Sequence, residues 1–489
     1  MTINKSTFKF NMLLAVAVLT QSFTLYGQND SNSIDRYKGV HILSQNPWYW
    51  QYQGEPIVLR GGSDDDNPYQ WTGKQLTDQL DLLVSVGGNY IRNTMSDRDK
   101  GNIYAFKKVK NDKYDLTKWN DEYWKRLTFF LDETSKRGII VQLTLWDQFD
   151  IGGSQWGKHP WNPENNANIK AGALNGREDF YSTVDRNDSD QIAFQQNYID
   201  KLLSVTLVYD NVLYNINNES SESGDWENYW ARYIKKVAAE SGKKIYVTNM
   251  QLSATNAVRH VMSYGDVFDF VDISQNNQDS KGARGPAHWD YLMFLREKIA
   301  SYGPVPMNNV KIYGASDGST NFSAGSETEA IDRFWRNIFG GCASARFHRP
   351  SSPNKLWGSG LNERVQTNLK ALDMLLEKLN IFSCTPHNDL ISPCVSVPSM
   401  MEAYATANIG HQYTIYFPQG RFKVNLDPWV YAGKLKLQWL DINSLEWSEP
   451  EIVEVRWEGS KHDWGFRGLI TLETPSNRPC IALLEIMEE

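Results

Sequence analysis

The chain has 489 residues, of which 41% are hydrophobic and 22% charged, and its mean hydropathy is −0.52. This composition excludes a disordered, collagen-like or coiled-coil protein. The net charge of −8, with no basic run, argues against a nucleic-acid partner. Aromatic residues make up 13% of the chain, including 18 Trp, which suits either an aromatic core or flat platforms for a sugar.

The N-terminus has the pattern of a secretory signal. Lys5 and Lys9 precede a nine-residue apolar run, Met12 to Thr20, which is too short to cross a bilayer, and Gly27 offers a cleavage point. We therefore expect residues 1–27 to be a signal peptide and the protein to be exported, to the periplasm or the outside of the cell. No later stretch has the length of a membrane span.

The cysteines allow a disulfide but indicate no metal. An exported protein can oxidise its thiols, and Cys384 and Cys394 bracket a short loop. The sequence predicts a disulfide between them, with unpaired buried thiols as the alternative. No CxxC or HExxH motif is present, so neither a metal site nor a cofactor is expected.

Residues 28–385 alternate short β-rich runs with amphipathic helical runs. Continuous apolar and β-branched runs are typical of strands buried on both faces. Eight such βα units predict an α/β fold, a (β/α)8 TIM barrel. An open doubly wound sheet is the alternative, but no GxGxxG or Walker loop follows the first strand. The expected strands are 56–62, 89–95, 139–148, 211–220, 243–250, 268–277, 309–318 and 342–350. The expected helices are 74–87, 120–137, 190–208, 225–241, 253–262, 288–302, 326–339 and 362–381.

The pattern changes after residue 385. Pro386, Pro393 and Pro398 punctuate a linker, and only short alternating runs separated by Gly, Pro, Asn and Asp follow. Residues 386–489 therefore read as a small antiparallel β-sandwich domain.

Polar and aromatic side chains recur where the eight expected strands end, which in a barrel is the face that carries the active site. Amides, carboxylates, arginines and tryptophans in one place suit a polyhydroxylated ligand, although loop polarity alone also places Asn and Asp there. The substrate-binding candidates are Asp65, Arg92, Trp146, Asp147, Asn218, Gln275, Asn276, Tyr313, His348 and Arg349.

The fourth strand runs straight into Asn218-Glu219. This pair resembles the Asn-Glu signature of the large glycosidase clan with (β/α)8 barrels. The resemblance implies that Glu219 is the general acid/base, which protonates the departing glycosidic oxygen, and that Asn218 binds the sugar 2-hydroxyl. The alternative is a loop pair that starts the next helix, with Ser220 to Glu222 as caps.

The second carboxylate departs from the clan pattern, which has a Glu at the end of strand 7. That strand ends in Tyr313-Gly314-Ala315-Ser316-Asp317, so Asp317 is the candidate nucleophile or base, with a turn residue as the alternative. Asp147, Asp150 and the run Asp64–Asp66 are reserves. The run could also be a solvated loop or an edge for Ca²⁺, which needs several converging oxygens.

A rival motif overlaps this segment, because Gly314 to Gly318 matches the G-x-S-x-G elbow of serine hydrolases. That elbow leads at once into a helix, whereas here a polar stretch intervenes, so we do not favour an esterase.

Two further side chains have both a functional and a structural interpretation. In the clan an Arg at the place of Arg92 orders the strand-7 carboxylate, but a buried Arg requires a carboxylate partner in any case. His348 could contact ligand or be a hydrogen-bonded core residue. The strand-end aromatics expected as sugar platforms are Trp146, Trp156, Trp161, Tyr69, Trp71 and Trp357, whereas Trp119, Trp124, Trp226, Trp230 and Trp335 have helical spacing and are expected in packing.

The last third of the chain adds a second resemblance. The segment EAYATANIGHQYTIYFPQG is similar to the domain labelled "putative collagen-binding" that follows such barrels, including apiosidase-like enzymes. Together with the signal peptide and Asn218-Glu219, it resembles exported polysaccharide-utilisation glycosidases. The resemblance implies an O-glycosyl hydrolase that acts on an oligo- or polysaccharide without a cofactor. The alternatives are a glycan-binding barrel without catalysis and a protein-binding surface protein.

Overall fold

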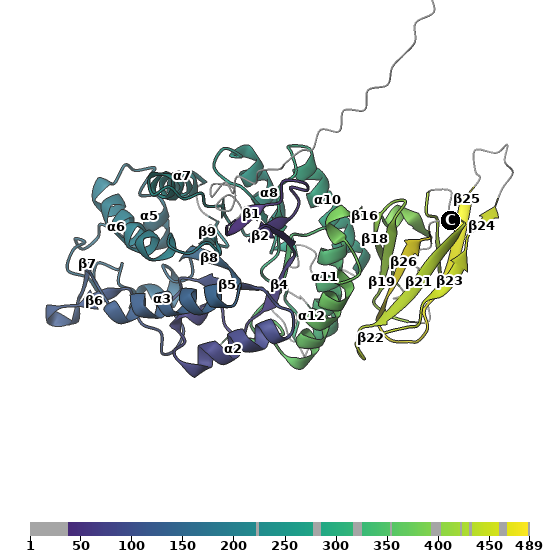
Figure 1. Ribbon diagram of the computed structural model, residues 1–489. Helices are drawn as coiled ribbons and strands as arrows, with labels where there is room; N and C mark the ends of the chain where they lie inside the picture. Colours follow the sequence, from purple (N-terminus) through teal and green to yellow (C-terminus); the bar gives the residue numbers. More distant parts are fainter. Residues whose placement is uncertain are drawn as a thin grey trace, which may run out of the picture.

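The computed structural model describes residues 38–221, 224–276, 285–315, 325–352, 355–392, 402–420, 423–429, 433–458 and 467–487. Parallel strands surrounded by helices form the larger part, and antiparallel sheets form the C-terminal part (Figure 1). The protein is therefore a mixed α/β protein, as predicted.

Eight parallel strands follow one another around the larger part. Ladders join β5, β8, β9 and β10, and others join β11 to β12 and β13 to β4. Backbone hydrogen bonds link the remaining neighbours, such as Asn89 N to Arg60 O at 2.9 Å, Asp269 N to Val247 O at 2.8 Å and Ala343 N to Met307 O at 2.8 Å. The strands are β4 (Leu59–Gly62), β5 (Tyr90–Thr94), β8 (Ile140–Asp147), β9 (Val212–Asn218), β10 (Val247–Thr248), β11 (Val271–Asp272), β12 (Met307–Asn308) and β13 (Ser344–Phe347).

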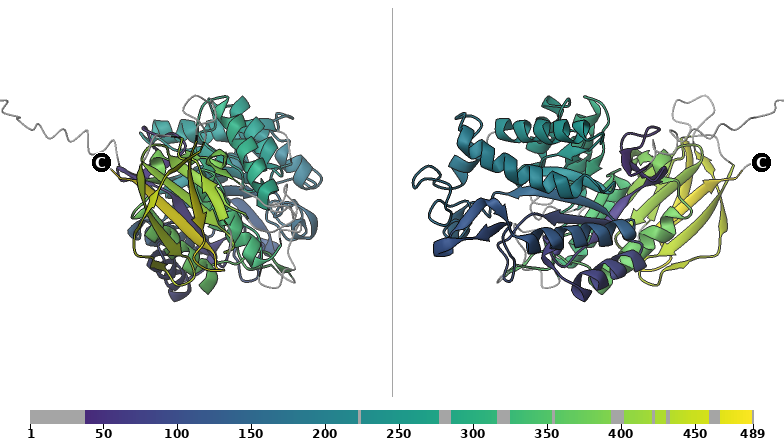
Figure 2. Two further views of the ribbon diagram at one scale, coloured as in Figure 1. Left: turned by 90° about the vertical axis from the view of Figure 1, so that its right-hand side faces the viewer. Right: turned by 60° about the vertical axis from the view of Figure 1, so that its left-hand side comes forward.

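A helix follows each of these strands and covers the outside of the ring (Figures 1 and 2). Several helices begin at residues suited to capping: Ser326 and Glu329 form a capping box at α11, and the Asn120 side chain accepts from Glu122 N at α3. The helices are α2 (Lys74–Ser85), α3 (Asp121–Lys136), α6 (Ser189–Thr206), α7 (Gly224–Glu240), α8 (Ala254–Ser263), α10 (Gly285–Ala300), α11 (Glu327–Phe339) and α12 (Glu363–Leu376). Two short helices, α4 (Gly153–Trp156) and α5 (Arg177–Tyr181), and a hairpin of β6 (Phe106–Lys108) and β7 (Tyr114–Trp119) lie in the connections.

The expected helices other than the last, and the first four and the eighth expected strands, match these bounds to within about three residues at each end. The fifth and sixth strands were expected at 243–250 and 268–277, but β10 and β11 are strands of two residues each. The last helix stops at Leu376, five residues before the expected 381. The seventh strand was expected at 309–318, but β12 is a two-residue strand at Met307–Asn308, and only the bridge from Ile312 to Phe347 continues it.

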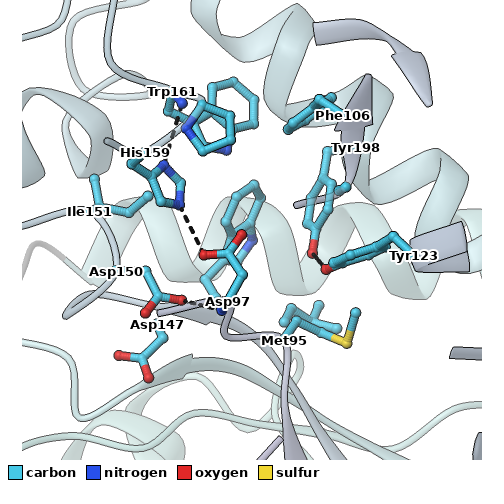
Figure 3. A pocket seen from close by; sticks show the side chains of 14 residues that line it. Met95, Asp97, Phe106, Tyr123, Asp147, Asp150, Ile151, His159, Trp161 and Tyr198 are labelled. Atoms are coloured by element: carbon cyan, nitrogen blue, oxygen red, sulfur yellow. Dashed lines mark hydrogen bonds and ion pairs between the residues drawn. The ribbon is translucent and has the colours of Figure 1, made fainter. Parts of the chain in front are cut away.

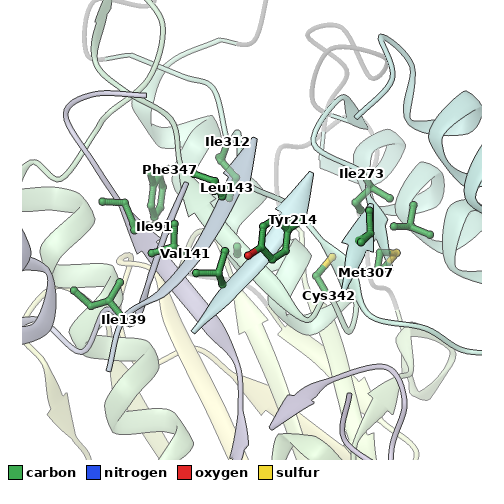
Figure 4. Close-up of a cluster of buried hydrophobic side chains, with 14 of the residues drawn as sticks. Ile91, Ile139, Val141, Leu143, Tyr214, Ile273, Met307, Ile312, Cys342 and Phe347 are labelled. Atoms are coloured by element: carbon green, nitrogen blue, oxygen red, sulfur yellow. The ribbon is translucent and has the colours of Figure 1, made fainter. Parts of the chain in front are cut away.

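Side chains alternate along the ring strands because successive residues point to opposite faces. Val141 and Leu143 of β8 belong to the large core beneath the helices (Figure 4), whereas Ile140 belongs to a separate cluster. That second cluster collects the first residues of several strands around Trp50, whose indole N–H donates to Asn308 at 2.9 Å. The small sheet of β1 (Val40–Ile42), β2 (Trp50–Tyr52) and β3 (Glu55–Ile57) thus closes the amino-terminal end of the ring with apolar side chains.

The C-terminal part consists of two antiparallel sheets that share one apolar cluster. One sheet contains β16 (Thr385–Pro386), β18 (Tyr404–Asn408), β19 (Gln412–Phe417), β26 (Cys480–Ile486), β21 (Lys434–Asp441), β22 (Glu446–Trp447) and β23 (Glu451–Glu454). The other contains β17 (Ile391–Ser392), β20 (Lys423–Leu426), β25 (Arg467–Glu473) and β24 (Arg456–Glu458).

The first of these sheets packs against α11. The Tyr416 ring stacks on Trp335 at 5.5 Å, and its hydroxyl donates to Asp332 at 2.8 Å. Arg336 faces Glu402 at 3.4 Å across the same contact. Burial raises the pKa of Asp332 to about 6, although Arg336 opposes the shift.

The cysteines do not support the predicted disulfide. Cys384 is a free, buried thiol, and Cys394 lies outside the described residues. Within the described ranges we find no helix that is both long and apolar enough to span a membrane.

Candidate active site

Glu219 lies directly after β9 in a strained position. Its φ is +51°, a left-handed conformation that costs a non-glycine residue about 1–3 kcal/mol and recurs at functional sites. The other non-glycine residues with positive φ in the described ranges are exposed or half-buried turn residues, whereas Glu219 is 7% exposed. Ser220 N donates to Met250 O at 2.7 Å, and the Gln148 amide donates to the Glu219 carbonyl. These contacts hold the turn that aims Glu219 into the strand-end face.

The carboxylate of Glu219 pairs with a lysine that the sequence analysis did not single out. Lys311, 2% exposed, forms an ion pair with Glu219 Oε1 and donates to Asn218 Oδ1 at 2.7 Å. Arg92 donates to the same Asn218 oxygen at 2.8 Å. Burial lowers the pKa of Lys311, although the Glu219 carboxylate opposes this shift. The Asn218 side-chain oxygen therefore accepts hydrogen bonds from two cations, Arg92 and Lys311, beside the Glu219 carboxylate.

Asp66 is the second buried carboxylate at this face. Arg92 lies 3.0 Å from it, His348 3.4 Å, Arg349 3.4 Å and Arg346 3.9 Å. Burial favours the neutral acid, but His348 and the arginines outweigh it and hold the pKa of Asp66 well below its usual range. Asp66 is thus an ionised hub for Arg92 of β5 and for Arg346 and Arg349 in and after β13.

This hub bears on two expectations. A strand-7 carboxylate or a structural ion pair was expected for Arg92; among the described residues its carboxylate partner is Asp66, after β4, and Asp317 lies outside them. Asp65 was the expected ligand contact of the acidic run. Instead its carboxylate accepts from Asp66 N at 2.7 Å and from the Trp71 indole at 3.1 Å, so Asp65 shapes the loop while Asp66 enters the site.

The rings of Tyr313, His348 and Trp357 form a wall that runs from Glu219 to Arg349. The Tyr313 hydroxyl donates to Glu219 Oε1 at 3.4 Å, and its ring meets His348 edge-on at 4.7 Å. Trp357, half-buried, lies 6.1 Å from both rings, and the Arg349 guanidinium lies 6.0 Å from the Trp357 ring. The expected contacts Tyr313, His348 and Arg349 therefore do come together beside Glu219.

Trp146 does not lie where a sugar platform would. Its side chain is 4% exposed and packs against Trp161, Phe180, Tyr198 and Trp226 at 4.9–6.1 Å between ring centroids. The platform expectation is wrong for Trp146, and equally for the buried Trp161 and Tyr69, because the loops after β5 and β8 fold over them. Trp71, Trp156 and Trp357 remain half-buried.

Asp147 and Asp150, the expected contact and its reserve, belong to a buried ion-pair network. Arg98 lies 2.6 Å from Asp147 and 2.8 Å from Asp150, which commits both to a structural partner. Beside them lies a small cavity of about 30 Å³ lined by Asp97 and His159 (Figure 3). Burial raises the pKa of Asp150 to about 7 and lowers that of His159 to about 3. Because both carboxylates are paired with Arg98, neither is free to act as the second catalytic carboxylate.

The side chains of two predicted amide residues, Asn276 and Gln275, are buried inside the ring. The Asn276 side chain bonds to Asn337 at 3.2 Å and to Asn309 at 3.0 Å, so its amide is largely committed to structure. Gln275 is 1% exposed, and its carbonyl oxygen has no hydrogen-bond partner among the described atoms.

The rest of the strand-7 prediction falls outside the described residues. Asp317, and the Ser316 and Gly318 of the G-x-S-x-G motif, are among them. Within the described part of the chain, no cluster of three or more His, Cys, Asp or Glu side chains could hold a metal.

A groove of about 850 Å³ adjoins the site through Gln148, whose amide contacts the Glu219 carbonyl. Phe149, which is 41% exposed, and Trp156 line it with Arg177.

Lys311 and Arg346 were not among the predicted site residues, and Asp66 was predicted only as part of the reserve run Asp64–Asp66. A signal existed for Lys311: it stands two residues before Tyr313 in an apolar run, and residues at that spacing share one strand face. For Asp66, three consecutive Asp residues gave no means of choosing the inward one.

Comparisons with known proteins show the fold. A family model described as "Domain of unknown function (DUF6298)" matches residues 98–287. No curated protein matches the chain. A solved structure described as "Glycoside hydrolase" has a TM-score of 0.63 at 13% identity and covers 93% of this chain and 98% of that one. A glycoside hydrolase family 5 protein from Bacteroides vulgatus ATCC 8482 has a TM-score of 0.63 at 12% identity, covering 93% and 95%. The family 5 mannosidase from Rhizomucor miehei has a TM-score of 0.50 at 14% identity, covering 71% and 99%. The chain thus shares its fold with solved glycoside hydrolases.

Proposed function

We propose that this protein is an exported glycoside hydrolase that cleaves a glycosidic bond in an oligo- or polysaccharide with two carboxylates. In this proposal the larger part is a (β/α)8 barrel, residues 28–385, and residues 386–489 are a β-sandwich. Residues 1–27 are its signal peptide. The fold shared with solved glycoside hydrolases supports the class.

One observation carries the proposal: Glu219 is a buried carboxylate in a strained left-handed turn at the end of β9, beside Asn218. A strand that merely led into the next helix would not require this conformation. Strain of this kind persists where the surrounding contacts determine it, and it is typical of active sites.

In the proposed reaction Glu219 protonates the departing glycosidic oxygen and later accepts a proton from water. Lys311 and Tyr313 orient its carboxylate. Arg92 and Lys311 fix the Asn218 amide. Asp317 remains the proposed second carboxylate, since the oxygens of Asp66, Asp147 and Asp150 face arginines. The adjoining groove with Phe149 and Trp156 suits further sugar units of a longer chain.

One observation favours a second candidate, a glycan-binding barrel without catalysis. The Glu219 carboxylate forms a buried ion pair with Lys311, and a structural role as the partner of that cation accounts for its burial without catalysis. This candidate predicts affinity for a glycan without release of products.

The experiment is a screen of plant, algal and host glycans with reducing-sugar detection, using the wild type, Glu219→Gln and Asp332→Asn. Asp332 is a matched control because it is a half-buried carboxyl on α11, in the contact with the C-terminal sheet. We expect product from the wild type and from Asp332→Asn but not from Glu219→Gln. Binding without product from any of the three supports the second candidate instead.

A further inference from the structure

Among the described residues, the strand-end face holds three buried arginines around one buried carboxylate. Arg92, Arg346 and Arg349 are each no more than 7% exposed and share Asp66, whereas Glu219 is paired separately with Lys311. Buried charges in proteins are almost always paired because desolvation without a partner costs several kcal/mol.

Two acidic side chains at the rim do not remove this excess. Asp99 is half-buried and lies 3.4 Å from Arg349, which is longer than a charge-assisted hydrogen bond of about 2.7–2.9 Å. The Asp65 carboxylate is occupied by backbone N–H groups and the Trp71 indole, and burial raises its pKa toward the neutral form.

Neighbouring cations contribute to the lowered pKa values of Arg346 and His348. Burial, together with Arg92 and Arg349, lowers the pKa of Arg346 to about 10 despite the opposing Asp66. Burial, Lys311 and the neighbouring arginines lower the pKa of His348 well below its usual value, again against Asp66. Arg92, Arg346 and Arg349 therefore share the Asp66 carboxylate, and Arg349 has the half-buried Asp99 as a second partner.

Arg349 is the cation of this group that is placed to meet a ligand. Arg346 is committed to the Val310 carbonyl at 2.8 Å and to Ser63, and Arg92 to Asp66 and Asn218. Arg349 forms long ion pairs with Asp66 and Asp99, each at 3.4 Å, and its Nε–H makes no hydrogen bond among the described atoms. The guanidinium fork is suited to two-pronged recognition of a planar anion.

The position of Arg349 connects it to the candidate reaction centre. Tyr313 touches Glu219 at 3.4 Å, and His348 and Trp357 lie between Tyr313 and Arg349. A sugar that reached Glu219 would lie along this wall of rings, with its substituents within range of the guanidinium.

We propose that Arg349 binds an anionic substituent, a uronic-acid carboxylate or a sulfate ester, on the sugar that lies beside Glu219. The substrate is then an acidic glycan. This inference rests on the proposed function, since it needs the sugar to lie at Glu219, and it adds the chemical class of that sugar. Carboxylate and sulfate share the chemistry that Arg349 recognises.

The test uses pairs of glycans that differ only in charge: a polyuronate and its carboxyl-reduced form, and a sulfated galactan and its desulfated form. Binding and hydrolysis are measured for the full chain, its Arg349→Gln and Arg349→Lys variants, and Arg364→Gln as the control. Arg364 is a partly exposed arginine on α12 that pairs with Glu327 at 3.5 Å. Thermal unfolding reports whether each variant is folded.

For the wild type we expect at least tenfold tighter binding or lower KM for one charged glycan than for its neutral partner, falling as salt rises. Arg349→Gln should abolish this preference, Arg349→Lys should retain part of it, and Arg364→Gln should leave it unchanged. The member of the panel that is preferred identifies carboxylate or sulfate.

Equal use of charged and neutral partners by the wild type would overturn the inference. The proposed function would survive that result if Glu219→Gln still abolished hydrolysis of the neutral glycans. Conversely, charge-dependent binding that Arg349→Gln removes, with no hydrolysis by any protein, would support the anion site and contradict the hydrolase. A preference that persists in a folded Arg349→Gln variant would also overturn the assignment.

Discussion

The two ends of the strand ring are built from opposite kinds of side chain. At the amino-terminal end, Leu59, Tyr90, Ile140 and Leu213 pack around Trp50 in an apolar cluster. At the other end, Glu219, Lys311, Asp66 and three arginines lie buried in one continuous charge network. Apolar packing stabilises the fold, whereas the charged end buries ions and includes a strained turn. Under the proposed function, the apolar end holds the ring of strands together and the charged end carries the reaction.

The largest expected effect on stability is at the apolar end. Trp50→Ala removes a fully buried indole and its hydrogen bond to Asn308. We expect a loss of about 3–5 kcal/mol in the free energy of unfolding, from denaturant titration. Activity per folded molecule should stay unchanged, and a large loss of activity in the folded fraction would contradict the division between the two ends.

The contact between α11 and the C-terminal sheet gives a pH-dependent effect of intermediate size. The pKa of Asp332 is about 6 in the folded protein and about 3.8 in the unfolded chain, so the folded state holds this proton more tightly. Its contribution to stability is present in full below pH 3.8 and is lost as pH rises through 6. At one pKa unit per 1.36 kcal/mol, the difference is roughly 2–3 kcal/mol.

The measurement is the free energy of unfolding of the wild type and Asp332→Asn at pH 4 and pH 7. The wild type should lose about 2–3 kcal/mol more than the variant between these values, because Asn cannot ionise. Equal losses in the two proteins would show that Asp332 is not the source of the pH dependence of stability.

A smaller effect is expected at Lys311. Lys311→Met removes the ammonium that forms the ion pair with Glu219. We expect kcat/KM to fall by about tenfold because Glu219 and Asn218 lose an orienting partner.

Lys311→Arg is the matched control, because it keeps the charge and should keep most of the activity. Full activity in a folded Lys311→Met protein would show that the ion pair does not orient Glu219.

The sequence predicted the helices well because each carries a strong apolar period and several carry a capping residue, as at Ser326 of α11. It singled out Glu219 because a continuous apolar strand ending in Asn-Glu is a local pattern. It failed where partners come from distant strands. Trp146 stands next to the last residue of β8, where a side chain can face solvent, and only the loops folded over it show that it is core. Asp66 and Lys311 become recognisable as site residues only when the ring brings them to Arg92 and Glu219.

The central claim is that Glu219 is the proton donor of a glycosidase, and leaving-group dependence tests it most directly. The rates of the wild type and Glu219→Gln are compared on the preferred glycan and on an aryl glycoside of the same sugar whose phenol leaves without protonation. We predict a loss of about 10²–10⁴-fold on the glycan and a much smaller loss in the bond-cleaving step of the aryl glycoside. Equal losses on both substrates, or full activity of the variant on the glycan, would contradict the account.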